Sequence, residues 1–242
     1  MAAAVWVAPQ IQSVAAAAAA SGDPPTFVGL TSASVGGPAL CSNDSVVVAV
    51  PAGVQAGDLL LAFVTSQADS TVSQASFVSQ GTAAESSGLG VDTVRTTVLT
   101  RVATGSEPAT YTFSRTSPGV ICLPRTLRVV LLAYRGASGI DGGAIVSQVS
   151  PGSATSPQPS PSAPTSGPNR TVLRLAGATF RTLGAPTWGT ASSGSERTDT
   201  GGQRAILVTE ATQAVAGATG TATVPQAPAW YGVLWTVALA PT

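Results

Sequence analysis

The sequence contains no histidine and no lysine, so every basic side chain in its 242 residues is one of eleven arginines. Without histidine the chain can build neither a Ser-His-Asp triad nor a Cys-His nucleophile, and metal sites that use histidine are excluded as well. We therefore expect a protein that is not an enzyme and that carries no cofactor.

Charge of either sign is scarce, because charged residues make up only 9% of the chain and eleven acids balance the eleven arginines. The nearest approach to a basic stripe is Arg125 with Arg128, whereas neutralising a phosphate backbone takes a longer one. We therefore expect no nucleic-acid partner. A surface with so little charge does little to repel neighbours, which favours a homo-oligomer, with a trimer as one candidate.

Cysteine is limited to Cys41 and Cys122. Two residues are too few for a disulfide framework, and they lack the spacing of a metal site. Two separate buried thiols are favoured over one disulfide, because cysteine packs as a small apolar side chain.

The N-terminus is rich in alanine, but no basic residue precedes its apolar run and polar residues interrupt it within residues 1–20. These features argue against a signal peptide and against a membrane span. We predict that residues 1–25 form an assembly arm that buries Trp6, Val7 and Ile11 against a partner, and we expect no membrane partner.

From residue 26 onward the pattern is that of β-strands, with short runs of β-branched or apolar residues bounded by glycine, proline, asparagine or aspartate. In residues 110–114 the aromatic side chains alternate with hydroxyls, which predicts a strand with one wet face. Residues 127–134 are continuously apolar, which predicts a central strand covered on both faces. The predicted strands are residues 27–34, 46–50, 59–65, 94–101, 110–114, 125–135, 145–149, 172–180, 204–215 and 231–240.

Residues 150–170 are rich in proline and serine. Proline cannot donate to a sheet ladder, so this segment is either a linker between two domains or a crossover inside one sandwich. We favour the crossover, because each half alone would leave open sheet edges. The prediction is therefore an all-β, jelly-roll-like antiparallel β-sandwich of about ten to twelve strands over residues 26–242, preceded by the arm.

Few acids lie close enough in sequence to suggest a pair that hydrolyses glycosides. Glu196 and Asp199 are the nearest neighbours, and we interpret them as part of a solvated loop. Asp58 is interpreted as a turn residue, and Asp141 as a local ion-pair partner of Arg135.

Aromatic residues offer a different kind of site, because tryptophan and tyrosine faces stack on sugar rings. Trp188, Trp230 and Tyr231 lie near strand ends or turns and are candidate glycan-facing residues. Packing in the core is the more frequent fate of such side chains, and both alternatives stay open.

Several segments share their order and spacing with a known family. They are residues 50–62, 100–113, 133–137, 214–220 and 237–239. Together they resemble the jelly-roll-like modules of bacteriophage virion proteins, chiefly tail and appendage components, and of some secreted bacterial proteins. The resemblance spans residues 26–240 and departs from the family at Phe77, where the family has a tryptophan in a Pro-Gly-Trp turn.

The resemblance implies a fold and a context, and no chemistry. It implies a bacteriophage virion structural protein on the particle surface. The small single-domain size and the arm favour a capsid decoration (cement) protein that docks on neighbouring capsid or tail subunits. Its alternative is a tail or fibre module that binds a receptor polysaccharide. A secreted bacterial protein is the alternative localisation.

Overall fold

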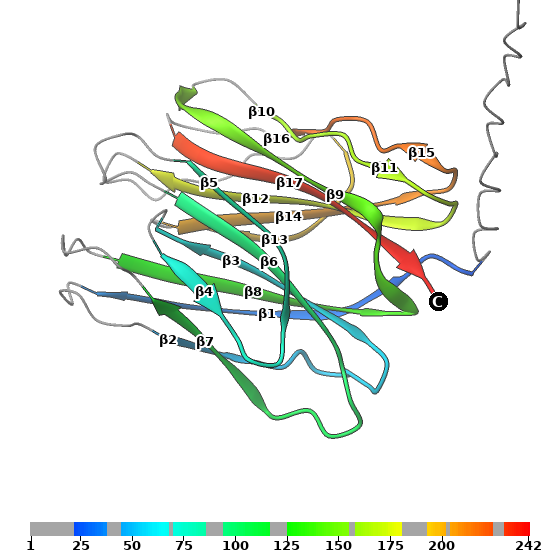
Figure 1. Cartoon of the computed structure of the whole chain (residues 1–242), viewed down its shortest axis with the longest axis horizontal. Coiled ribbons are helices and arrows are strands. Elements are labelled where there is room, and N and C mark those ends of the chain that lie inside the picture. Colours follow the sequence, from blue (N-terminus) through cyan, green and yellow to red (C-terminus); the bar gives the residue numbers. More distant parts are fainter. Residues whose placement is uncertain are drawn as a thin grey trace, which may run out of the picture.

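The structure is a computed structural model that describes residues 22–37, 45–67, 70–85, 94–116, 125–154, 158–180, 193–201, 204–224 and 230–242. These residues form seventeen β-strands and no helix. Among them there is accordingly no helix long and apolar enough to cross a membrane. The strands pair antiparallel and stack in layers (Figure 1), which confirms the all-β sandwich predicted from the sequence.

The first eight strands make two sheets. They are Thr26–Gly37 (β1), Ser45–Ala49 (β2), Leu59–Ser66 (β3), Thr71–Ser73 (β4), Val78–Glu85 (β5), Val94–Val102 (β6), Thr110–Thr116 (β7) and Arg125–Arg135 (β8). One sheet, here called the central sheet, has the order β1-β8-β3-β6-β5, and the other, the outer sheet, has the order β2-β7-β4. The pairs β1 with β8, β2 with β7 and β3 with β6 are those of a jelly-roll-like sandwich, whereas β5 pairs with β6 and not with β4.

A further sheet, the C-terminal sheet, follows in the chain. Its strands are Ala137–Ala154 (β9), Arg170–Phe180 (β12), Ser195–Thr200 (β13), Arg204–Gln213 (β14) and Trp230–Pro241 (β17). Their order is β13-β14-β12-β17-β9. Gly136 alone connects β8 to β9, and its φ of 70° is a conformation that glycine adopts at little cost. The chain therefore changes sheets at this residue.

Four very short strands pair two connecting segments with each other. They are Gln158–Pro159 (β10), Pro164–Thr165 (β11), Gly217–Ala218 (β15) and Thr223–Val224 (β16), paired β10 with β16 and β11 with β15. We call residues 158–165 and 217–224 the cover. Ala163 of the cover packs with Val172 and Ala238 of the C-terminal sheet. The proline-rich segment thus joins two strands of one sheet, β9 and β12, and lies against that sheet.

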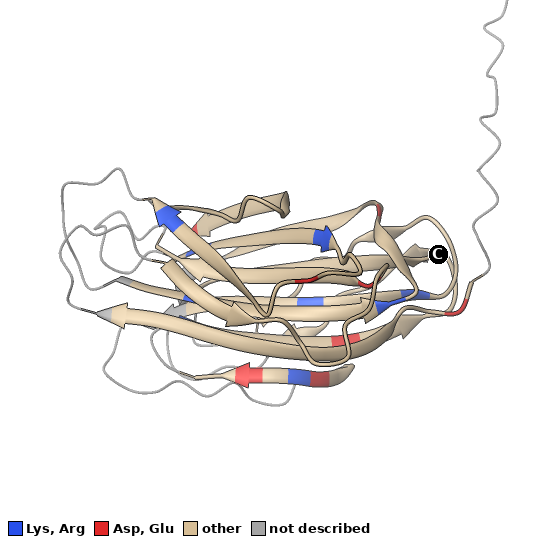
Figure 2. Ribbon diagram, turned by 90° about the horizontal axis from the view of Figure 1, so that it is seen from below, with Lys and Arg blue, Asp and Glu red and all other residues tan. Residues whose placement is uncertain are grey.

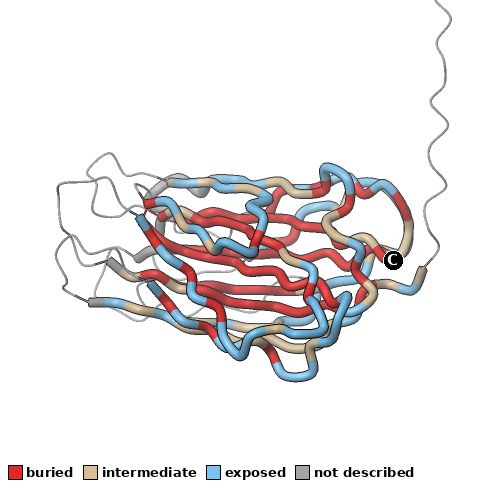
Figure 3. The backbone as a smooth tube through the Cα atoms, turned by 60° about the horizontal axis from the view of Figure 1, so that its bottom comes forward, coloured by how far each residue is buried: buried red, intermediate tan, exposed pale blue. Residues whose placement is uncertain are grey.

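The central sheet is buried on both faces. In β3 the odd-numbered side chains from Leu59 to Phe63 pack against the C-terminal sheet, and the even-numbered ones from Leu60 to Val64 pack against the outer sheet. Strand β8 alternates in the same way, which confirms the prediction that residues 127–134 form a central strand. Figure 3 shows the resulting buried interior between exposed outer layers.

Strand β7 confirms the other periodicity prediction. Tyr111 and Phe113 are buried, while Thr112 between them and Thr110 and Ser114 on either side are exposed. Phe77 packs edge-on against both aromatic rings, at centroid distances of 5.0 and 5.4 Å. The outer sheet therefore has one dry face and one wet face.

Two strands of five or more residues, β5 and β13, were not predicted, and β9 is longer than predicted. All three lie at sheet edges. An edge strand buries few side chains, so it needs no apolar pattern that a sequence would reveal. Twelve of the seventeen strands have five residues or more, in line with the predicted ten to twelve.

Candidate functional site

The residues predicted for an assembly arm or a glycan site fall largely outside the described part of the chain. This holds for Trp6, Val7, Ile11 and Trp188, and also for Cys41 and Cys122. Trp230 and Tyr231 lie in β17, but only their backbone is described. These assignments remain predictions.

The expected pairing of Asp141 with Arg135 is wrong, because Gly136 sends the two residues to different sheets. Arg135 instead donates from Nε to Oδ1 of Asp58 at 3.1 Å and from Nη2 to Oδ2 at 3.0 Å. The Oδ2 atom of Asp58 also accepts from the backbone N–H of Gln55 at 2.8 Å. Asp58 is therefore the turn residue that the sequence predicted, and it also closes the turn against β8.

Asp141 forms a buried ion pair with Arg170, at the start of β12. Arg170 Nη2 donates to Asp141 Oδ1 at 3.3 Å, and its Nε lies 3.2 Å from Oδ2. The backbone N–H of Ser166 donates to Oδ2 at 2.6 Å. Burial by itself would raise the pKa of Asp141, but the hydrogen bonds from Arg170 and Ser166 outweigh it, so the pKa is lowered. The pair ties the end of the proline-rich segment to β9.

Glu196 and Asp199 lie in strand β13 rather than in the loop expected from the sequence, and both are exposed. Their neighbour Arg197 is turned to Glu210, with Nη2 2.8 Å from Oε1. Among the described residues, no three side chains of the types that ligate metals come together.

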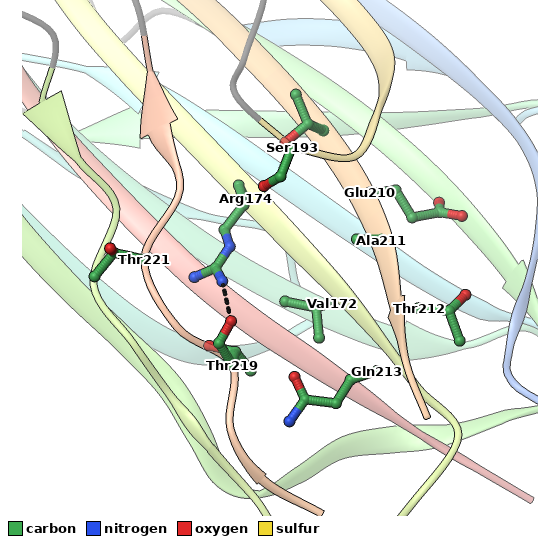
Figure 4. A pocket seen from close by; sticks show the side chains of 10 residues that line it. Val172, Arg174, Ser193, Glu210, Ala211, Thr212, Gln213, Thr219 and Thr221 are labelled. Atoms are coloured by element: carbon green, nitrogen blue, oxygen red, sulfur yellow. Dashed lines mark hydrogen bonds between the residues drawn. The ribbon is translucent and has the colours of Figure 1, made fainter. Parts of the chain in front are cut away.

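A pocket of about 210 Å³ opens on the face of the C-terminal sheet that carries the cover (Figure 4). Its lining residues are Val172, Arg174, Ser193, Thr209, Glu210, Ala211, Thr212, Gln213, Thr219 and Thr221. Nearly all of them are polar, and none is aromatic.

Arg174 is the most conspicuous of these residues, since it is almost fully buried. Its Nη1 donates to the carbonyl of Pro161 at 2.8 Å, and its Nη2 donates to the carbonyls of Thr219 and Gly220 at 3.0 and 2.9 Å. It therefore bonds both segments of the cover to the sheet. Sequence reasoning missed this role, although an arginine between Leu173 and Leu175 was a signal of a buried cation.

Gln213 is engaged in the same way, because its Nε2 donates to Thr165 Oγ1 and to the carbonyl of Gly217. The amide and the guanidinium of the pocket thus hold the cover in place. We therefore assign these pocket residues a structural role, which is to hold the cover against the C-terminal sheet.

The wet face of the outer sheet is rich in hydroxyl side chains. We call it the hydroxyl face. Its exposed side chains are Ser45, Val47 and Ala49 of β2, Thr110, Thr112, Ser114 and Thr116 of β7, and Thr71 and Ser73 of β4. None is charged, and the strand register places Ser114 between Ser45 and Ser73 and places Thr112 beside Val47.

Charge is sparse over the rest of the described molecule as well (Figure 2). Many of the charged side chains pair with each other within the protein, in the ion pairs Asp58–Arg135, Asp141–Arg170, Glu210–Arg197 and Glu107–Arg101. The surface therefore has fewer free charges than the composition alone suggests.

Comparison with protein-family models, with curated proteins and with solved structures finds no significant match to this chain.

Proposed function

We propose that this protein is a structural component of a bacteriophage virion, foremost a capsid decoration (cement) protein that docks on neighbouring capsid or tail subunits. The observation that carries the proposal is the hydroxyl face. Docking removes water from a surface, and this costs less for hydroxyls, which can form hydrogen bonds with the partner, than for charged groups. The cores of protein interfaces are depleted in charge for the same reason.

Two further observations support the proposal. Three strand pairs of residues 26–135, β1 with β8, β2 with β7 and β3 with β6, follow the order of a jelly roll, which is the fold that the resemblance of residues 50–62 and 100–113 implies. The internal ion pairs leave little charge to repel a neighbouring subunit.

The anchoring of residues 22–25 defines where an arm would leave the sandwich. Thr171 Oγ1 donates to the carbonyl of Pro25 at 2.7 Å, and Asn169 Nδ2 donates to the carbonyl of Gly22 at 3.1 Å. In this proposal residues 1–21 extend from this point to a neighbouring subunit, with Trp6, Val7 and Ile11 as the buried contacts. A deletion that tests the arm is best ended at residue 21.

The first test asks whether the protein belongs to a particle. An antibody against the folded protein is used to label purified particles of the phage that encodes it, and the labelled particles are viewed by electron microscopy. Regular labelling of heads supports a decoration protein, labelling of tails moves the protein to a tail position, and unlabelled particles overturn the proposal.

The second test asks which surface docks. Thr112→Lys places a charge in the middle of the hydroxyl face, and Ser195→Lys places the same charge at an exposed position of β13. The variants are added to particles from which the natural protein has been removed. We expect Thr112→Lys to weaken this rebinding by about tenfold or more, because the lysine must be desolvated. We expect Ser195→Lys to leave the rebinding unchanged. Equal rebinding of both variants would remove the hydroxyl face from the proposal.

Deletion of residues 1–21 completes this series. Loss of rebinding with an unchanged unfolding temperature assigns the docking energy to the arm. If rebinding is unaffected and a glycan array shows binding that Trp188→Ala abolishes, the receptor-binding alternative takes first place.

A further inference from the structure

The edges of the C-terminal sheet differ sharply in charge. Edge strand β13 has three charged residues among six, namely Glu196, Arg197 and Asp199. Edge strand β9 has eighteen residues, and its one charged residue, Asp141, is buried in the ion pair with Arg170. Proteins commonly protect exposed sheet edges with charged side chains, prolines or bulges. Of these two described strands, β13 is protected by charged side chains and β9 is not.

The unprotected part of β9 is the run 145–150, with the sequence Ile-Val-Ser-Gln-Val-Ser. It pairs in continuous register with residues 232–237 of β17, and irregular pairing begins on either side of it. The run contains neither a proline nor a charge, and Ser147, Gln148 and Val149 are exposed, the last at 38%. Alternate N–H and C=O groups of an edge strand point away from its sheet, so this run offers a regular row of hydrogen-bonding groups to another strand.

The surroundings of the run also carry little charge. Strand β17 beside it has no charged residue, and β5, the edge of the central sheet that contacts β9, has one, Glu85 at its end. Val78 of β5 is 65% exposed. Apart from Glu85, these strands carry no charge that would oppose the approach of a similar surface.

We infer that the run 145–150 binds the same run of a second copy of this chain, antiparallel across a twofold axis, so that two C-terminal sheets join into one. A twofold contact brings the same surface of two copies together. Two copies of this run can meet because the run carries no charge that would repel its own copy. A charged partner strand would instead place an unpaired charge beside Val149. The inference concerns the free protein in solution and does not depend on a role in a particle.

The test is the mass of the full-length protein as a function of concentration, by light scattering or sedimentation. We expect a shift from 23.8 kDa towards twice this mass. Ser147→Lys puts a charge in the middle of the run, where the twofold axis brings the two lysines close together, so we expect it to weaken the dimer by about tenfold or more. Ser195→Lys, the same exchange at the opposite edge of the sheet, should leave the dimer unchanged.

Hydrogen exchange provides a readout that needs no variant. Outward-pointing amides within 145–150 should be protected at high protein concentration and exposed at low concentration, while β13 should show no difference. A monomer at every concentration, a trimer, a dimer that Ser147→Lys leaves intact, or amides whose protection does not depend on concentration would each overturn the inference.

Discussion

Tyr134 links the two sheets that enclose the larger core. It lies on β8, and its hydroxyl donates to Glu210 Oε2 on β14 at 2.8 Å. Arg197 also binds Glu210, and its guanidinium lies 4.4 Å from the ring centroid of Phe27 on β1. Burial and the charge of Glu210 both raise the pKa of Tyr134, so its hydroxyl stays protonated and acts as a donor.

Replacing Tyr134 by phenylalanine tests this link. We expect Tyr134→Phe to lower the free energy of unfolding by about 1.5 to 3 kcal/mol, the usual contribution of a hydrogen bond to a charged group. Tyr111→Phe is the control, because its buried hydroxyl has no hydrogen-bond partner among the described residues and should be lost without cost. Equal effects of the two variants in urea denaturation would contradict the assignment.

The buried Asp141 predicts how stability depends on pH. Its pKa is lowered in the folded state, so its contribution is complete above the pKa of the unfolded chain and is lost as the pH falls through the folded pKa. We expect Asp141→Asn to be clearly less stable than the natural protein at pH 7. The difference should shrink as the pH falls below about 4, where the carboxyl of the unfolded chain becomes protonated while that of the folded protein is still charged. Urea denaturation at a series of pH values measures it, and a difference that stays constant would show that the carboxylate charge is unimportant.

Between elements, the central and C-terminal sheets approach each other closely at Gly177 of β12. A Cβ there would lie 2.5 Å from Thr96 Cγ2 and 2.7 Å from Thr65 Cγ2. Nearby, Trp235 Nε1 donates to Thr96 Oγ1 at 2.7 Å. The spacing of the two sheets therefore depends on the missing side chain.

We expect Gly177→Ala to destabilise the protein by about 1 to 3 kcal/mol, the usual cost of overpacking a core. The matched control is Gly105→Ala, because a Cβ at Gly105 meets no atom within 4 Å. Thermal unfolding of the two variants measures the difference. If Gly177→Ala unfolds at the natural temperature, the sheets are not packed as closely as described.

For the whole molecule, the decisive feature is that both large cores share the central sheet. Each of β3, β6 and β8 contributes alternate side chains to the core with the C-terminal sheet and to the core with the outer sheet. Neither core can lose its packing without exposing a face of the same strands. The jelly roll and the C-terminal sheet should therefore unfold together.

Calorimetry should show one transition, with a calorimetric enthalpy equal to the van't Hoff enthalpy of the monomer. Residues 26–135 alone should aggregate, because the apolar face that includes Leu61, Phe63 and Leu132 would lose its cover. Two separate transitions, or a soluble and folded fragment 26–135, would contradict this shared-sheet account.

The sequence by itself determined the fold class and the positions of the strands with a strong pattern. Alternation in residues 110–114 and continuous apolar character in residues 127–134 are local signals, because side chains in a strand alternate between two faces. It also located one strand of the hydroxyl face, since the wet side of residues 110–114 follows from that alternation.

Only the tertiary structure decided which distant residues meet. It paired Asp141 with Arg170 and Arg135 with Asp58, bonded Arg174 to both segments of the cover, and set β2 and β4 beside β7. The physical reason is that these contacts depend on which strands become neighbours, which no local pattern encodes. Edge strands such as β5 and β13 stayed hidden for the related reason that they bury too little to need an apolar pattern.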